Sequence, residues 1–298
     1  MNVISRFNWL KPLRIIGLLL LLAGLQACST LKLAYNQAPE AIWWYVSDYV
    51  DFRDNQRVLV KNELGSFQKW HRRTQLPGYL DTLQTVRQRL PDTLDAGQAC
   101  EIYADARTRM KALTAYSDRL TPGTLETLST LDADQFAGME KRFAKANAKY
   151  RDEHMEGSAK SVRDKRIKRA VKRAEMIYGD LSDKQLDVLK ARLDQSSFDA
   201  SVNYAERLRR QQDTLQTLRG LSRSEASPER ARTALRALVE RSLESTDPKF
   251  KQYDEKLRLE NCQTMADVHN ITTPEQREKA VLKIKGYEQD LGILLKQI

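Results

Sequence analysis

Apolar side chains recur at helical spacing along most of this 298-residue chain. A clear example runs through Phe136, Met139, Phe143, Ala146 and Tyr150, which are alternately three and four residues apart. That spacing places the five side chains on one face of a helix. Alternating runs rich in Val, Ile and Thr, which would indicate strands, are few. The pattern therefore predicts an all-α protein.

A repeated motif marks where several helices begin. Leu, then Asp or Ser, then two residues and Gln occupy 94–98, 131–135 and 181–185, and 273–276 is a Thr variant. In such a capping box the Asp, Ser or Thr oxygen accepts from the third helical amide, and the Gln reaches back to the cap amide. We expect helices to begin at 95, 132, 182 and 273. These starts are unevenly spaced, so we do not predict a solenoid.

Breaks between the apolar stripes set the number of helices. Pro77, Pro91, Gly157 and Gly179 interrupt or end helical runs. The whole chain has only 12 Gly and 8 Pro, so most of it is free to be helical. We expect a multi-helix bundle of roughly ten helices with short connections.

The first 27 residues have the three parts of a secretory signal. Arg6, Lys11 and Arg14 form a basic start, and residues 15–24 are an apolar run of ten. Such a run is too short to cross a bilayer, which needs about 20 apolar residues. An ordinary cleaved signal or a single membrane helix is the alternative to the interpretation given next.

The segment Leu25-Gln26-Ala27-Cys28 resembles the lipobox of bacterial lipoproteins. The resemblance implies cleavage before Cys28 and lipidation of its sulfur, which anchors the protein in a membrane. Residue 29 is Ser, where Asp favours inner-membrane retention in that class, so we expect an outer-membrane protein facing the periplasm. The chain would then comprise a signal peptide (1–27), the lipidated cysteine with a short spacer (28–37) and one helical domain (38–298).

Lipidation of Cys28 leaves two cysteines, Cys100 and Cys262. An even pair in an oxidising compartment indicates a disulfide. The alternative is two separate buried thiols, because free cysteine is often buried.

An aromatic segment follows the expected spacer. Trp43, Trp44 and Tyr45 lie within an apolar run from 41 to 46. Rings so near a lipid could rest at the membrane interface, where they are favoured. We favour the alternative that the run packs into the core, because a helix that is apolar on every side is usually buried.

Positive charge is concentrated in one stretch. Without Arg6, Lys11 and Arg14 the chain keeps 47 Lys and Arg against 40 Asp and Glu, a net charge of +7. Residues 141–178 alone hold 13 cations and 5 anions. The predicted basic face comprises Arg163, Lys165, Arg166, Lys168, Arg169, Lys172 and Arg173. It is either a solvated helix face or a surface for an acidic envelope component; nucleic acid fits the charge but not the compartment.

Motifs for catalysis or metal binding are absent from the sequence. His71, His154 and His269 are far apart, and none belongs to a paired metal-binding motif. Ser66 and Lys69 match the SxxK pattern without its companion motifs, within an expected helix. We therefore expect no enzymatic activity, no metal and no cofactor. A buried polar cleft containing His71 or His154 would favour an enzyme instead.

Several stretches together resemble one family of proteobacterial lipoproteins of unknown function. Beside the lipobox they are 33–36 (LAYN), Trp43-Trp44, 48–52 (DYVDF) with Gln56, 268–277 (VHNITTPEQR) and 287–291 (YEQDL). The resemblance implies an all-helical periplasmic domain and brings no catalytic residues. A weaker likeness, through the L-[DS]-x-x-Q motif, is to the Spy/CpxP-type periplasmic chaperones.

These observations lead to one function hypothesis and one alternative. We expect a non-enzymatic interaction or structural protein, anchored in the outer membrane through Cys28, whose basic face meets an acidic envelope partner. The alternative is a chaperone-like holdase for unfolded envelope proteins.

Overall fold

The computed structural model describes residues 30–223 and 227–297, and all its regular elements there are helices. In chain order they are α2 (Thr30–Asn36), α3 (Ala38–Ser47), α4 (Asp54–Thr74), α5 (Leu76–Arg89), α6 (Ala96–Ala112), the 3-10 helix η1 (Leu113–Arg119), α7 (Pro122–Ser129), α8 (Ala133–His154), α9 (Ala159–Tyr178), α10 (Asp183–Gln195), α11 (Ala200–Arg223), α12 (Pro228–Leu243), α13 (Pro248–Asn270) and α14 (Pro274–Leu295). The all-α prediction is confirmed. The thirteen α-helices in these ranges exceed the roughly ten expected, partly because α2 occupies most of the segment expected to be a spacer.

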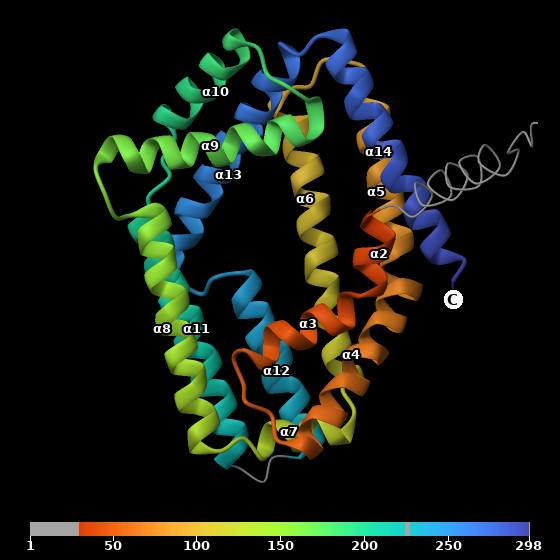
Figure 1. Ribbon diagram of the computed structural model, residues 1–298, viewed down its shortest axis with the longest axis vertical. Helices are drawn as coiled ribbons and strands as arrows, with labels where there is room; N and C mark the ends of the chain where they lie inside the picture. The colour runs from red at the N-terminus through yellow and green to blue at the C-terminus, as the bar shows by residue number, and fades with distance from the viewer. Residues whose placement is uncertain (1–29, 224–226, 298) are drawn as a thin grey trace, which may run out of the picture.

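The helices lie around an elongated ring (Figure 1). Helices α8 and α11 run side by side along one long side, and α5 and α14 run along the other. Helices α9 and α10 close one end, and α7 lies at the opposite end. Helix α13 packs along α6. None of the helices described is long and apolar enough to cross a membrane.

Apolar burial follows this arrangement. In the described part of the chain the core is divided into small clusters, each where two or three helices meet. One cluster joins Leu90, which follows α5, to Tyr178 of α9 and Ile284 of α14. Another places Val50, which precedes α4, against Phe136 and Met139 of α8. The ring is therefore held together at its helix contacts rather than by one central core.

All four predicted capping boxes form. Asp95, Asp132, Ser182 and Thr273 each accept a hydrogen bond from the third helical amide, at 2.8, 2.9, 3.4 and 3.2 Å. In each box the glutamine side chain accepts from the cap amide in return. The leucines before the first two caps, Leu94 and Leu131, are buried, as expected of a hydrophobic staple. The predicted helix starts are confirmed.

Three of these glutamines also join helices, which the motif alone does not predict. Gln185 and Gln276 exchange hydrogen bonds through their side-chain amides, at 2.6 and 3.1 Å. Gln185 also donates to the carbonyl of Ile271, and Gln276 to that of Asp180. Each acceptor lies two residues before the other helix's cap, so α10 and α14 are joined at their N-termini.

A similar pair joins α4 to α8. Gln135 of α8 donates to Gln56 of α4 and to the carbonyl of Asp51, both at 2.8 Å. Gln56 donates to the hydroxyl of Thr130 at 3.1 Å. Both glutamines are about 2% exposed or less, so every one of these bonds replaces water. We call the two pairs the glutamine junctions.

The predicted disulfide is present. Cys100 of α6 is bonded to Cys262 of α13, which are 162 residues apart in the sequence. The bond covalently closes a large part of the ring and links two helices that already pack together.

Candidate functional site: an arginine-lined cleft

A cleft of about 810 Å³ opens inside the ring, between α8, α11 and the start of α13. Tyr45 and Val46 line it from α3, Phe143 and Tyr150 from α8, and Phe250 from α13. Clefts of this size hold a small ligand or a short peptide segment, and aromatic walls provide most of the contact area. The cleft is the largest of the described cavities.

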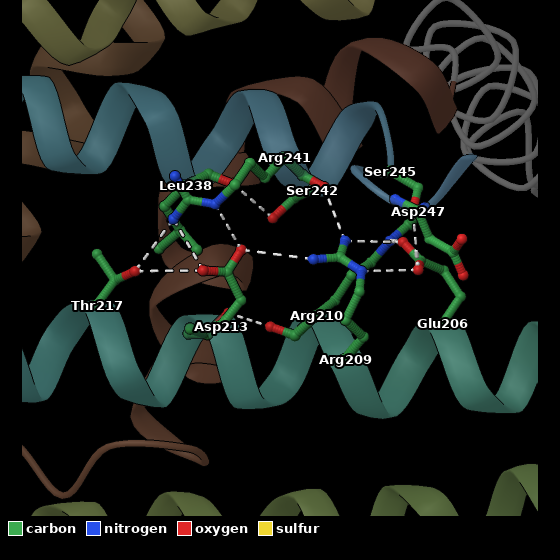
Figure 2. Close-up of polar contacts among 11 residues, drawn as sticks. Glu206, Arg209, Arg210, Asp213, Thr217, Leu238, Arg241, Ser242, Ser245 and Asp247 are labelled. Carbon is green, nitrogen blue, oxygen red and sulfur yellow. Dashed lines mark hydrogen bonds and ion pairs between the residues drawn. The ribbon is translucent and has the colours of Figure 1, made fainter. Parts of the chain in front are cut away.

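Helix α11 presents two different polar sides. One side faces α12 and carries the charges shown in Figure 2. Arg209 and Arg210 each donate to Glu206, at 2.8 and 2.7 Å, and Arg241 of α12 donates to Asp213 at 2.8 Å. We call this group of five residues the α11–α12 network. Glu206 and Arg210 also line part of the cleft, where their charges are paired with each other.

The network satisfies its charges internally. Burial alone would raise the pKa of Glu206, but hydrogen bonds from Arg209, Arg210 and Ser245 outweigh it and lower that pKa below its ordinary value. The hydrogen bond from Arg241 likewise lowers the pKa of Asp213. Both carboxylates are thus ionised at neutral pH and partnered by guanidinium groups.

The other polar side of α11 faces the cleft and carries Arg207. Its Nε donates to Asn147 of α8 at 2.8 Å, and its guanidinium lies over the ring of Tyr150, 5.7 Å from the ring centroid. No carboxylate of the described residues forms an ion pair with Arg207. Arg209 and Arg210 form ion pairs with Glu206, whereas the charge of Arg207 is not neutralised by a carboxylate of the described residues and faces the cleft.

Two arginines of α9 extend this positive charge. Arg166 lies 4.6 Å from the ring centroid of Phe198, and Arg169 donates to Nδ1 of His154 at 3.0 Å. Phe198 and His154 both line the cleft. Burial lowers the pKa of Arg166 and outweighs the more distant charges of Asp194 and Glu260, which raise it; Arg169 has a smaller lowering effect. Within the described ranges neither arginine has a carboxylate at ion-pair distance.

Arg207 therefore lines the cleft, and Arg166 and Arg169 contact two residues of its wall; none of the three forms an ion pair with a carboxylate of the described residues. We call Arg166, Arg169 and Arg207 the open arginines. Guanidinium groups bind carboxylates and phosphates through paired hydrogen bonds, most strongly where water is partly excluded. This arrangement can bind an anion held against aromatic rings.

The predicted basic face is thus divided in three by the structure. Arg166 and Arg169 turn to the cleft, as described. Arg163 pairs with Asp194 at 2.5 Å, and Lys165 donates to the carbonyl of Asp152 at 2.8 Å. The remaining three side chains are exposed and have no partner among the described residues: Lys168, Lys172 and Arg173.

His154 also lines the cleft, at a position where an imidazole could serve as a base. Its ring stacks on Tyr150 with 4.4 Å between centroids, and its Nδ1 accepts from Arg169. Burial, together with Arg169, lowers its pKa, so the imidazole is neutral at pH 7. Its nearest carboxylate is that of Glu153, 3.9 Å away, and no serine or cysteine side chain bonds to it in the described structure. This geometry supports ring stacking rather than nucleophile activation.

The other two histidines have structural contacts. His269 is 1% exposed and lies between the hydroxyl of Tyr178 and the carbonyl of Asp92. His71 contacts the hydroxyls of Tyr35 and Tyr79. No group of three or more His, Cys, Asp or Glu side chains among the described residues could hold a metal ion.

The aromatic segment near the N-terminus is divided between core and solvent. Trp43 is 6% exposed and stacks near Phe52, in line with the packing that we favour from the sequence. Trp44 and Tyr45 are 68% and 65% exposed, contrary to that expectation. The reason is that α3 packs on α4 through one side only. Cys28, the predicted lipidation site, lies outside the described residues.

Arg207 is the functional candidate that the sequence does not single out. It is one of many charges in a helix that the apolar pattern predicts over residues 198–219. A signal is present in retrospect: 203, 207, 211, 214 and 218 recur at helical spacing, on a stripe next to that of 206, 209, 210 and 213. Only the packed structure shows that one side closes on α12 and the other faces a cleft.

One known family matches a large part of this chain. The model described as "Family of unknown function (DUF6279)" matches residues 48–260, which include all three open arginines and most of the cleft wall. No curated protein and no solved structure matches the chain. Because the family model covers more than half of the 298 residues, the chain belongs to DUF6279, a family of unknown function.

Proposed function

We propose that this protein is a non-enzymatic binding protein of the bacterial cell envelope. In this proposal a lipid on Cys28 anchors it in the outer membrane, and the helical domain faces the periplasm. The signal-like N-terminus and the lipobox resemblance support the anchor. The cleft inside the ring is where the partner binds.

One observation carries the binding proposal: the open arginines converge on an aromatic cleft and have no carboxylate partner among the described residues. Unpaired charge in a half-buried site costs stability, because the group loses water without gaining an ion pair. An anionic partner would supply the missing charge. The exposed Lys168, Lys172 and Arg173 on α9 would attract the same partner and speed its approach.

The partner is therefore an acidic envelope component that bears carboxylate or phosphate groups. The aromatic walls formed by Tyr45, Phe143, Tyr150 and Phe198 would contact its less polar parts. The size of the cleft suits a chain segment or a small anionic molecule rather than a whole folded protein.

Photo-crosslinking in living cells tests this proposal. Benzoylphenylalanine would replace Phe143 in the cleft and Lys172 on α9, with Leu259 on the exposed side of α13 as the matched control. We expect one recurring acidic adduct from the first two positions and none from the control. That adduct should disappear when Arg207→Gln is added.

Other outcomes would change the proposal. A spread of many unfolded envelope proteins at Phe143 would favour a chaperone-like holdase, for which suppression of client aggregation by the purified domain would be the second test. Equal adducts at all three positions, or none at Phe143, would contradict a binding role for the cleft.

A further inference from the structure

The first described helix begins very close to the predicted lipid. Helix α2 starts at Thr30, two residues after Cys28. Two residues can span at most about 7 Å between Cα atoms. An anchor of that length leaves no room for a flexible tether between lipid and protein.

Helix α2 is also fixed firmly to the rest of the ring. Gln68 of α4 donates to the carbonyl of Tyr35 at 2.6 Å, and Arg72 donates to Asn36 at 2.8 Å. The hydroxyl of Tyr35 lies 3.0 Å from Nδ1 of His71. These contacts place α2 at a defined position against α4, so the body cannot swing away from the anchor without breaking them.

Large apolar side chains are exposed on this same end of the chain. Leu33 of α2 is 60% exposed, and Trp44 and Tyr45 of α3 are 68% and 65% exposed. Trp43, one residue away, is buried and has Lys61 5.2 Å from its ring centroid. Tryptophan and tyrosine favour the boundary between lipid headgroups and hydrocarbon, where an apolar ring and a polar edge are both accommodated.

We infer that α2 and α3 lie on the surface of the anchoring membrane, with Trp44 inserted at the lipid interface. The inference rests on the lipid anchor of the proposed function. The short distance from Cys28 selects the bilayer as the occupant of this face, because a lipid on Cys28 would hold the membrane surface within about 7 Å of the start of α2. Since Tyr45 also lines the cleft, the cleft then opens next to the membrane surface.

Bromine quenching of tryptophan fluorescence tests the inference. Lipidated protein would be purified from membranes and reconstituted into vesicles of phosphatidylethanolamine and phosphatidylglycerol, with or without brominated acyl chains. One variant, Trp43→Phe with Trp70→Phe, keeps Trp44. The matched control, Trp44→Phe with Trp70→Phe, keeps the buried Trp43 next to it.

We expect Trp44 to lose most of its fluorescence in brominated vesicles and its emission to move to shorter wavelengths. Trp43 should change little. Protein that floats with the vesicles while Trp44 is quenched no more than Trp43 would overturn this inference and leave the anchor intact. Protein that does not float with the vesicles would overturn both the anchor and the inference.

Discussion

The two polar sides of α11 carry similar residues in opposite circumstances. On the side facing α12, Glu206 and Asp213 are each paired with arginines, and all the partners belong to the protein (Figure 2). On the side facing the cleft, Arg207 has an amide and a tyrosine ring as neighbours but no carboxylate within the described structure. Both sides belong to one helix, so a difference in helix propensity does not explain why one set of charges is paired and Arg207 is not. We call the side of α11 that faces α12 the closed side, and the side that carries Arg207 the open side. The closed side stabilises the fold, and the open side is available to a ligand.

The largest expected effect is on the closed side. Glu206→Gln removes the charge that pairs with Arg209 and Arg210 and that accepts from Ser245. We expect the free energy of unfolding to fall by about 2–4 kcal/mol, because two guanidinium groups lose their carboxylate. Urea denaturation measures it. Glu240→Gln, at an exposed position of α12, is the control, and equal losses for the two variants would show that the network adds nothing.

The glutamine junctions should rank next. Gln276→Leu leaves a cap amide, the carbonyl of Asp180 and the buried side chain of Gln185 without their partner, so we expect a loss of about 2–3 kcal/mol. Gln98→Leu breaks a capping box of the same form that has no glutamine partner in another helix, so about 1 kcal/mol is expected. Thermal or urea unfolding would compare them. If Gln98→Leu cost as much as Gln276→Leu, the junction between helices would have no role.

Acid should weaken the fold at two buried carboxylates, Glu206 of the α11–α12 network and Glu63 of α4. Burial alone would raise the pKa of Glu63, but hydrogen bonds from Thr124, Tyr116 and Thr121 outweigh it and lower that pKa below its ordinary value. The pKa of Glu206 is lowered in the same way by its own partners. A carboxyl whose pKa is lower in the folded protein than in the unfolded chain stabilises the fold when the pH is above its unfolded-state pKa, near 4.5. This stabilisation is lost as the pH falls from that value through the lower pKa of the folded protein.

Variants of the two sides separate their contributions to this acid sensitivity. The free energy of unfolding of the parent should fall more steeply below pH 4.5 than that of Glu206→Gln, which lacks one of these carboxylates. Arg207→Gln should follow the parent. Parallel curves for the parent and Glu206→Gln would contradict the assigned pKa direction.

The smallest effect on stability is expected on the open side. Arg207→Gln removes a charge that forms no ion pair, so the free energy of unfolding should change by no more than about 0.5 kcal/mol. Arg166→Met should be neutral or slightly stabilising, because burial is the largest influence on the pKa of its guanidinium and lowers it. Urea denaturation would check both. A loss as large as that of Glu206→Gln would make Arg207 a structural residue.

Local sequence patterns account for much of the fold. The capping boxes at Asp95, Asp132, Ser182 and Thr273 depend on residues within one helix turn, so the sequence alone is enough to recognise them. The disulfide can also be predicted, because Cys100 and Cys262 remain as a pair once Cys28 is set aside as the expected lipidation site. What the patterns do not contain is which helices are neighbours, and the pairing of the capping glutamines depends on that.

Only part of the candidate site can be predicted from the sequence, because the sequence does not show which helices are neighbours. Arg166 and Arg169 stand in an evident basic stretch, but their contacts with Phe198 and His154 depend on how α9 meets the cleft. Arg207 belongs to a helix whose charges look evenly mixed along the chain. It lacks a carboxylate partner because the acidic residues near it on α11, Glu206 and Asp213, pair with other arginines.

A crosslink from position 143 is the decisive measurement for the binding cleft. Cells would carry benzoylphenylalanine at Phe143, either with native Arg207 or with Arg207→Gln, and the adduct would be measured at equal protein levels. We predict a recurring acidic adduct that is lost with Arg207→Gln, although the variant stays folded and abundant. An adduct of undiminished yield in the Arg207→Gln background would contradict the claim that the open arginines form a binding site.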